Sequence, residues 1–119
     1  MSTVLVAEDD PDLRDLVAMT LHDAGLDVDV ACDGNEALAH VAAHRPDLIL
    51  LDMMMPVMDG RAFSAALRYT KNPPPIVVMT AVDRVAQSAE DVGAVSWLAK
   101  PFDIDELVDT VRRCLDGAT

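Results

Sequence analysis

The sequence predicts an α/β fold of three layers, with a five-stranded parallel sheet between two layers of helices. Short apolar runs alternate five times with longer segments of helical periodicity, which is the pattern of consecutive βα units. Two of the runs, at residues 48–51 and 76–79, are continuously apolar, as is typical of strands that helices cover on both faces. A chain of 119 residues fits one domain with a single core.

The apolar runs predict strands at residues 4–7, 28–32, 48–51, 76–79 and 96–99. The segments that follow them predict helices at about residues 11–24, 34–44, 60–70, 84–92 and 104–115. Because every strand is followed by a helix, the strands should run parallel and be joined by right-handed crossovers.

Cap signals support the predicted helix ends. Asp10 lies directly before Pro11, which gives an N-cap followed by proline at the first helical position. The spacing of a capping box, with an aspartate as the cap, precedes two further helices, at Asp33 with Glu36 and at Asp103 with Glu106. Glycines stand where three helices should end: Gly25, Gly93 and Gly117.

Polar side chains follow four of the five predicted strands: Glu8, Asp9 and Asp10, then Asp52, Thr80 and Lys100. In a parallel sheet the carboxyl ends of the strands meet at one edge, where ligands bind. Carboxylates gathered there must take up protons or hold a cation, and ligands that are all oxygen favour Mg²⁺. An aspartate beside that ion can accept a phosphoryl group, whose charge Lys100 would neutralise while the Thr80 hydroxyl donates a hydrogen bond.

Several residues near this edge have a simpler interpretation. Asp10 and Asp59 could be metal ligands, but each lies where a helix begins and is better explained as an N-cap. We interpret the methionines after Asp52 as packing residues of a loop, not as ligands of a soft metal. Trp97, taken alone, is a half-buried core aromatic.

Four blocks of residues occur in order over essentially the whole chain: Glu8-Asp9-Asp10, the segment 52–60, Met79-Thr80-Ala81 and Lys100-Pro101-Phe102. Together they resemble the receiver domain of two-component response regulators. The resemblance implies a flavodoxin-like (βα)5 fold with strand order 2-1-3-4-5, in which the first and third strands are neighbours. It implies one receiver domain over residues 1–119, and we expect no effector domain, because only four residues follow the last predicted helix. The sequence leaves open whether such a receiver stands alone or was excised from a longer regulator.

The resemblance also implies a role for each matching residue. Asp52 would accept the phosphoryl group from a phosphohistidine of a sensor histidine kinase or a histidine phosphotransfer protein. Asp9 would bind Mg²⁺ or Mn²⁺ directly, Glu8 would act largely through metal-bound water, and the backbone carbonyl of Met54 would be the third protein ligand. Such a domain catalyses only its own phosphorylation and dephosphorylation and is not otherwise an enzyme.

The same resemblance implies a conformational switch. Thr80 and Lys100 would bind the phosphoryl group, and the peptide bond before Pro101 would be cis. Trp97 stands where the family has a switching Tyr or Phe, and its larger side chain would restrict or alter the usual inward rotation. The output surface would be the helix at 84–92, the fifth strand and the helix at 104–115. Met54 and Val82 occupy two positions that set the rate of dephosphorylation, and both are apolar, so self-dephosphorylation should be slow.

Composition narrows the partners and the compartment. The formal net charge is −12, with 21 acidic and 9 basic residues, which argues against direct binding of nucleic acid. The sequence has no run of about 20 apolar residues and no signal peptide, and Cys32 and Cys114 are isolated, so we expect a cytoplasmic protein that does not enter a membrane. We expect a monomer or a weak dimer, with a downstream protein or a fused effector domain as the output partner.

Two other functions stay open at this point. One is a receiver-like interaction module that works without phosphorylation, whose mark would be the loss of Asp52, an acidic ligand or Lys100. The other is a Mg²⁺-dependent phosphohydrolase with an aspartyl nucleophile, although 119 residues leave little room for the cap that usually encloses the substrate.

Overall fold

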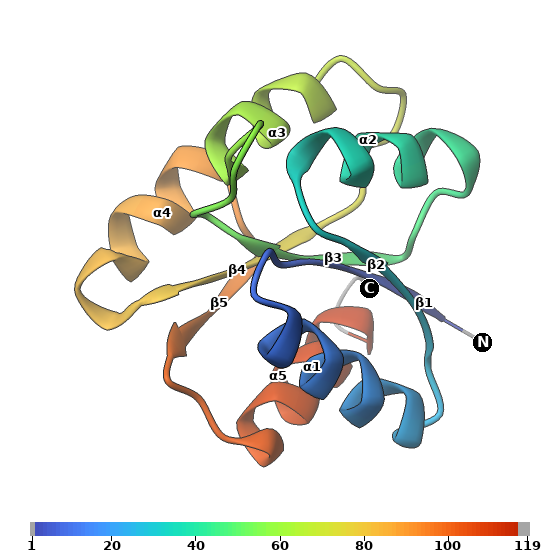
Figure 1. Cartoon of the computed structure of the whole chain (residues 1–119), viewed down its shortest axis with the longest axis vertical. Helices are drawn as coiled ribbons and strands as arrows, with labels where there is room; N and C mark the ends of the chain where they lie inside the picture. The colour runs from blue at the N-terminus through green and yellow to red at the C-terminus, as the bar shows by residue number, and fades with distance from the viewer. Residues whose placement is uncertain (1, 117–119) are drawn as a thin grey trace.

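The computed structural model describes residues 2–116, and its strands form one parallel sheet (Figure 1). The strand order is β2-β1-β3-β4-β5, which confirms the predicted order 2-1-3-4-5. Within this range the strands are β1 (Thr3–Ala7), β2 (Asp27–Ala31), β3 (Leu48–Asp52), β4 (Ile76–Ala81) and β5 (Ser96–Lys100). The helices are α1 (Pro11–Asp23), α2 (Gly34–Ala43), α3 (Gly60–Leu67), α4 (Val85–Val92) and α5 (Ile104–Asp116), with a 3-10 turn, η1 (Val82–Arg84), before α4.

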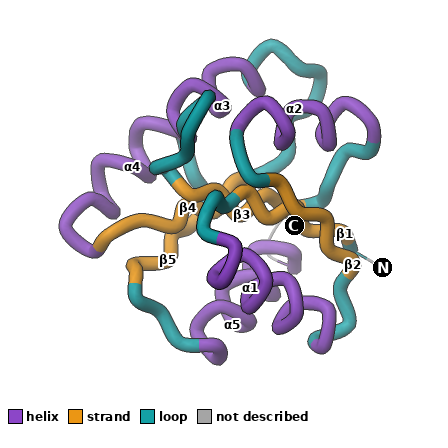
Figure 2. Tube along the Cα trace, in the orientation of Figure 1, coloured by secondary structure: helices purple, strands orange, loops and turns teal. Residues whose placement is uncertain are grey.

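The helices form two layers around the sheet, with α1 and α5 on one face and α2, α3 and α4 on the other (Figures 1 and 2). Each layer encloses its own apolar cluster. Val6, Leu50 and Leu107 belong to the cluster under α1 and α5, whereas Leu5 and Phe63 belong to the cluster under α2, α3 and α4. Successive side chains of residues 4–7 in β1 and 48–51 in β3 enter opposite clusters, which explains why these two runs are continuously apolar. No helix in residues 2–116 combines the length and the apolar character needed to cross a bilayer.

The predicted N-caps are confirmed. The side chains of four aspartates each accept a hydrogen bond from the first turn of the helix that follows: Asp10 from Asp12 N, Asp33 from Glu36 N, Asp59 from Ala62 N and Asp103 from Glu106 N. The capping box at α2 is altered, because the Glu36 carboxylate accepts a hydrogen bond from Cys32 Sγ at 3.0 Å. Gly25 and Gly93 adopt positive φ angles after α1 and α4, as predicted, whereas Gly117 lies outside the described residues.

Two helix ends differ from the prediction. The helix expected at 60–70 ends at Leu67, because the next amides bond in a tighter pattern: Tyr69 N donates to Ala66 O, and Thr70 N and Oγ1 both donate to Leu67 O. The helix expected from residue 84 begins as the 3-10 turn η1, directly after β4. This turn places Val82, Asp83 and Arg84 beside the carboxyl end of the sheet.

Candidate functional site

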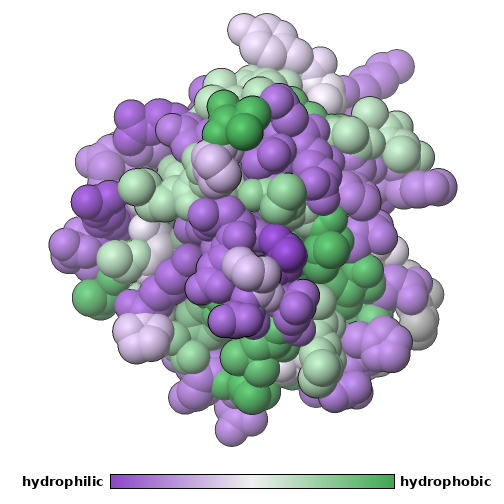
Figure 3. Space-filling view, in the orientation of Figure 1, coloured by the Kyte–Doolittle hydropathy of each residue, from purple (hydrophilic) through white to green (hydrophobic). Residues whose placement is uncertain are grey.

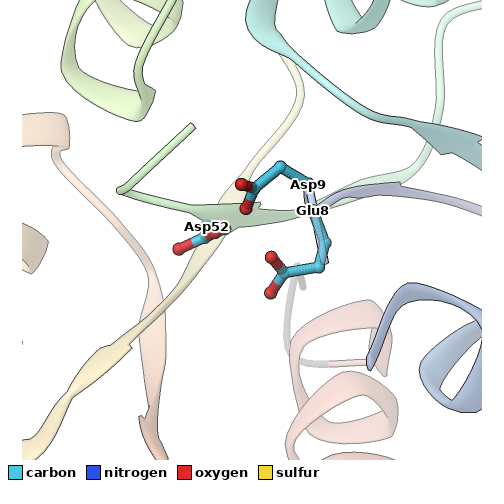
Figure 4. Close-up of side chains that lie close together, drawn as sticks. All are labelled: Glu8, Asp9 and Asp52. Carbon is cyan, nitrogen blue, oxygen red and sulfur yellow. The ribbon is translucent and has the colours of Figure 1, made fainter. Parts of the chain in front are cut away.

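β1 and β3 bring carboxylates together at the carboxyl end of the sheet. Ala7 pairs with Leu51, so the next residues along the two segments are Glu8 and Asp52. Glu8 is 1% exposed and Asp52 is 3% exposed, whereas Asp9 is exposed. One carboxylate oxygen from each of the three residues lies within 4.8 Å of the others (Figure 4). The donor set is all oxygen and includes two buried carboxylates, which fits a hard divalent cation such as Mg²⁺.

Lys100 is the cation that the fold places beside this cluster. It is the last residue of β5, and its Nζ lies 2.8 Å from Glu8 Oε1 and 3.3 Å from Asp52 Oδ1. Partial burial on its own would lower the pKa of Lys100, but the hydrogen bond to Glu8 and the charges of Asp52 and Glu8 outweigh it and raise the pKa. Lys100 therefore stays protonated and offsets part of the negative charge.

The environment of Asp52 raises its pKa to about 7. Burial is the main cause, followed by the hydrogen bond and the negative charge of Glu8, while the Met54 N–H and Lys100 act in the opposite direction. Asp52 is therefore protonated in a large fraction of molecules near neutral pH. A bound cation would displace that proton, because it favours the ionised carboxylate.

Backbone amides fix the orientation of the two buried carboxylates. Met54 N donates to Asp52 Oδ1 at 3.1 Å, and Asp10 N donates to Glu8 Oε2 at 3.2 Å. The contacts from Met54 and Lys100 both involve Oδ1 of Asp52, which is one of its two carboxylate oxygens. The side chains are thus oriented by a strand end and a loop, as reacting groups at the edge of a parallel sheet commonly are.

The carboxylates line an open cleft of about 480 Å³. Its wall also includes Thr80, Met54 and Lys100, so the residues predicted to act on a phosphoryl group face one space. Hydrophilic side chains gather at the middle of this face in the space-filling view (Figure 3). Asp52 is almost fully buried, yet it lines a cleft that opens to solvent.

The remaining predicted residues take separate positions. Thr80 is buried near the end of β4, whereas Trp97 on β5 is 54% exposed, which is more than a half-buried core aromatic would be. The Lys100–Pro101 peptide bond is cis, as expected. Met53 and Met55 pack into the core and Met58 packs against it, in agreement with their interpretation as packing residues, whereas Met54 is 64% exposed and the interpretation was wrong for it.

Two features of the site were not predicted from the sequence. Arg84 and Asp83 of η1 line the cleft, although only their short distance along the chain from Thr80 could have suggested this. Lys100 forms its shortest ion pair with Glu8, a residue 92 positions away, and no local pattern indicates such a partner.

Comparison with known proteins agrees with this geometry. The family model of the response regulator receiver domain matches residues 4–112. The response regulator MprA of Mycolicibacterium vanbaalenii is 40% identical over 118 residues, which cover 98% of this chain and 51% of that protein. The DNA-binding dual master transcriptional regulator RpaA of Synechocystis is 37% identical over 97% of this chain and 49% of its own length. The chain thus spans about half the length of these curated relatives.

Solved structures show the same architecture. The chemotaxis response regulator CheY4 of Vibrio cholerae superposes with a TM-score of 0.86 and 39% identity, covering 96% of this chain and 98% of that one. The receiver domain of the Francisella response regulator 1452 gives a TM-score of 0.90 and 30% identity over the full length of both chains. Fold, acidic cluster and sequence lead to one conclusion: this chain belongs to the family of response regulator receiver domains.

Proposed function

We propose that the chain is a signalling switch that accepts a phosphoryl group on Asp52 in the presence of Mg²⁺ or Mn²⁺. The observation that carries the proposal is the meeting of Glu8, Asp9 and Asp52 within 4.8 Å, beside Lys100, in an open cleft. In this proposal the carboxylates of Asp9 and Asp52 and the carbonyl of Met54 would hold the ion, and Glu8 would act largely through metal-bound water. The ion supplies positive charge for the oxygens of the transferring phosphoryl group.

The donor is a phosphohistidine on a sensor kinase or a phosphotransfer protein. A carboxylate oxygen of Asp52 forms a bond to phosphorus while the P–N bond breaks, and the electron pair of that bond stays with the imidazole of the donor. The negative charge on the phosphoryl oxygens is then shared with Lys100 and with the hydroxyl of Thr80 as a hydrogen-bond donor. Since Lys100 already contacts Asp52 at 3.3 Å, it needs little movement to reach the product.

The phosphoryl group adds about −1.5 to −2 charge to a cleft in which Glu8, Asp9 and Asp52 already meet. Thr80 lies near the end of β4 and Lys100 at the end of β5, so new hydrogen bonds would draw the two following loops toward Asp52. A shift from mostly inactive to mostly active requires roughly 5 kcal/mol of differential stabilisation, which several charge-assisted hydrogen bonds can supply. The output surface in this proposal is the face of α4, β5 and α5, on which Trp97 is exposed.

A downstream protein or a fused effector domain would bind this output surface. We propose that the domain does not itself bind nucleic acid, because its net charge of −12 opposes a phosphate backbone. Cys32 and Cys114 are free thiols, which supports a reducing compartment and therefore a cytoplasmic location.

Incubation with acetyl phosphate and Mg²⁺ tests the function by intact-protein mass spectrometry. A switch gains the mass of one phosphoryl group, and Asp52→Asn abolishes the gain. An interaction module that works without phosphorylation shows no gain. A phosphohydrolase releases phosphate continuously, in molar excess over the protein.

A further inference from the structure

The cleft around Asp52 contains more acidic than basic side chains. Its wall includes the carboxylates of Glu8, Asp9, Asp10, Asp52 and Asp83, and two cations, Lys100 and Arg84. An incoming phosphoryl donor is itself an anion, so the carboxylates repel it unless cations offset their charge. A cation in this cleft attracts such a donor only if no carboxylate already neutralises the charge of that cation.

Lys100 is already engaged in this way. Its Nζ contacts Glu8 at 2.8 Å and Asp52 at 3.3 Å, so much of its charge is offset by the acidic cluster before a phosphoryl group arrives. A group that carries about two negative charges therefore gains from a further cation besides Lys100 and the divalent ion of the proposed function.

Arg84 supplies a cation that is not paired in this way. Its Nη1 lies 3.8 Å from the sulfur of Met54, which is a weak acceptor, and across residues 2–116 it forms no ion pair with a carboxylate. Met54 also donates its backbone N–H to Asp52, and both Met54 and Arg84 line the cleft. Arg84 also lines the neighbouring pocket between α3 and α4. Arg61 differs because it lines that pocket and not the cleft around Asp52, and because it binds Asp91 at 2.6 Å.

We propose that Arg84 is a second phosphoryl-binding residue. Its guanidinium moves away from the sulfur of Met54 and binds the phosphoryl oxygens of the donor and of phosphorylated Asp52. This inference rests on the proposed function and adds to it a residue outside the predicted site. The guanidinium suits the task because it carries a positive charge and N–H donors that can bind an oxyanion, and a lysine at this position would keep the charge. Little is lost when it moves, since a contact to a thioether is weak and Arg84 is exposed.

The rate of phosphorylation by acetyl phosphate in Mg²⁺ tests the proposal. An oxygen of Asp52 bonds to phosphorus, the P–O bond to the acetyl group breaks, and acetate leaves with the electron pair; Arg84 neither gives nor takes a proton. We expect Arg84→Met to lower the rate at subsaturating donor by about three- to tenfold, and Arg84→Lys to retain most of it. The wild-type rate should also fall more steeply with added NaCl than the Arg84→Met rate, because salt screens a charge that the variant lacks.

Arg61→Met is the matched control, since it removes an arginine of the adjacent pocket, and its rate should stay within about twofold of the wild type. Equal rates for wild type and Arg84→Met, or an equal loss in Arg84→Met and Arg84→Lys, would overturn the role of Arg84 while leaving Asp52 as the acceptor. A wild-type chain that gains no phosphoryl group would overturn both proposals together.

Discussion

The Asp52 carboxyl is buried against Glu8, so its ionisation is coupled to the stability of the fold. Its pKa is about 7 in the folded protein, compared with an ordinary value of 3.8. A raised pKa means that the folded state binds the proton more tightly than the unfolded state does. The stabilisation from this residue is therefore complete below pH about 4 and is lost as the pH rises to about 7.

Asp52→Asn should accordingly stabilise the metal-free protein, because the amide keeps the shape of the carboxyl and removes its charge. We expect the free energy of unfolding at pH 8 to rise by roughly 1 kcal/mol, with a difference that grows between pH 4 and 7 and is constant above that. Urea unfolding in EDTA across this pH range measures it. Asp59→Asn is the control, because asparagine is an equally good N-cap. If Asp52→Asn were less stable than the wild type at pH 8, burial of the ionised Asp52 carboxylate would not destabilise the fold.

Met54 lines the cleft and Val82 lies between the lining residues Ala81 and Asp83. They are 64% and 73% exposed, and neither side chain can orient a water molecule toward phosphorus. We expect slow loss of the phosphoryl group from the wild type. Met54→Asn or Val82→Glu should speed it by roughly tenfold, because each places a polar group where water attacks. The decay of the phosphorylated mass after removal of acetyl phosphate measures this rate. If both variants lost the phosphoryl group at the wild-type rate, these two side chains would not control dephosphorylation.

Among the larger elements, the loop between β3 and α3 fixes the position of Asp52. Gly60 N donates to Met53 O at 3.2 Å, and a Cβ at Gly60 would lie 2.8 Å from the Cα of Met53 and 3.0 Å from the carbonyl oxygen of Asp52. The loop has no room for a side chain there, since these atoms are backbone. The position of the reacting carboxylate thus depends on a glycine eight residues after it.

Gly60→Ala should therefore push this loop away from the sheet. We expect a loss of about 1–3 kcal/mol in the free energy of unfolding, together with weaker Mg²⁺ binding, because the carbonyl of Met54 lies in the same loop. Chemical unfolding and a Mg²⁺ titration measure the two effects. Gly93→Ala is an instructive comparison, since nothing lies within 4 Å of its Cβ position and only its φ of 65° opposes the change. A Gly60→Ala protein with wild-type stability and metal affinity would refute the close packing.

The elements themselves were well predicted from the sequence, because apolar periodicity and caps such as Asp10 and Asp59 are local signals. The grouping of Glu8, Asp9 and Asp52 was predicted because polar residues follow the strands and the motif blocks match a known family, while their roles stay predictions. The position of Arg84 was not predicted, since it depends on the 3-10 turn η1 that replaces the start of the expected helix. The Lys100–Glu8 pair was missed for a similar reason: it depends on how four strands stack side by side.

At the scale of the whole molecule, the proposed switch must carry a change at Asp52 to a distant surface. Trp97 is the single tryptophan of the chain and lies on β5, more than half exposed. If Thr80 moves toward the phosphoryl group, we expect the indole ring to turn partway toward the space that Thr80 leaves, because its size restricts the full rotation of a Tyr or Phe.

We expect the Trp97 emission to shift to shorter wavelength on addition of acetyl phosphate and Mg²⁺, because the indole becomes less exposed. Fluorescence of the unmodified chain measures the shift, with Asp52→Asn as the control that should not respond. A phosphorylated protein with unchanged emission would exclude Trp97 from the switch and leave phosphorylation itself intact.

The proposed switch depends most on one arrangement, in which carboxylates that follow β1 share a divalent ion with Asp52 at the end of β3 and leave Asp52 able to bond to phosphorus. A crystal structure grown with Mg²⁺ and beryllium fluoride, a phosphoryl analogue, tests it directly. We predict one Mg²⁺ at about 2.0–2.1 Å from oxygens of Asp9, Asp52 and the Met54 carbonyl, with the fluoride group bonded to Asp52 and contacting Thr80 and Lys100. A metal bound elsewhere, or a fluoride group absent from Asp52, would contradict the proposed metal site and the role of Asp52 as phosphoryl acceptor.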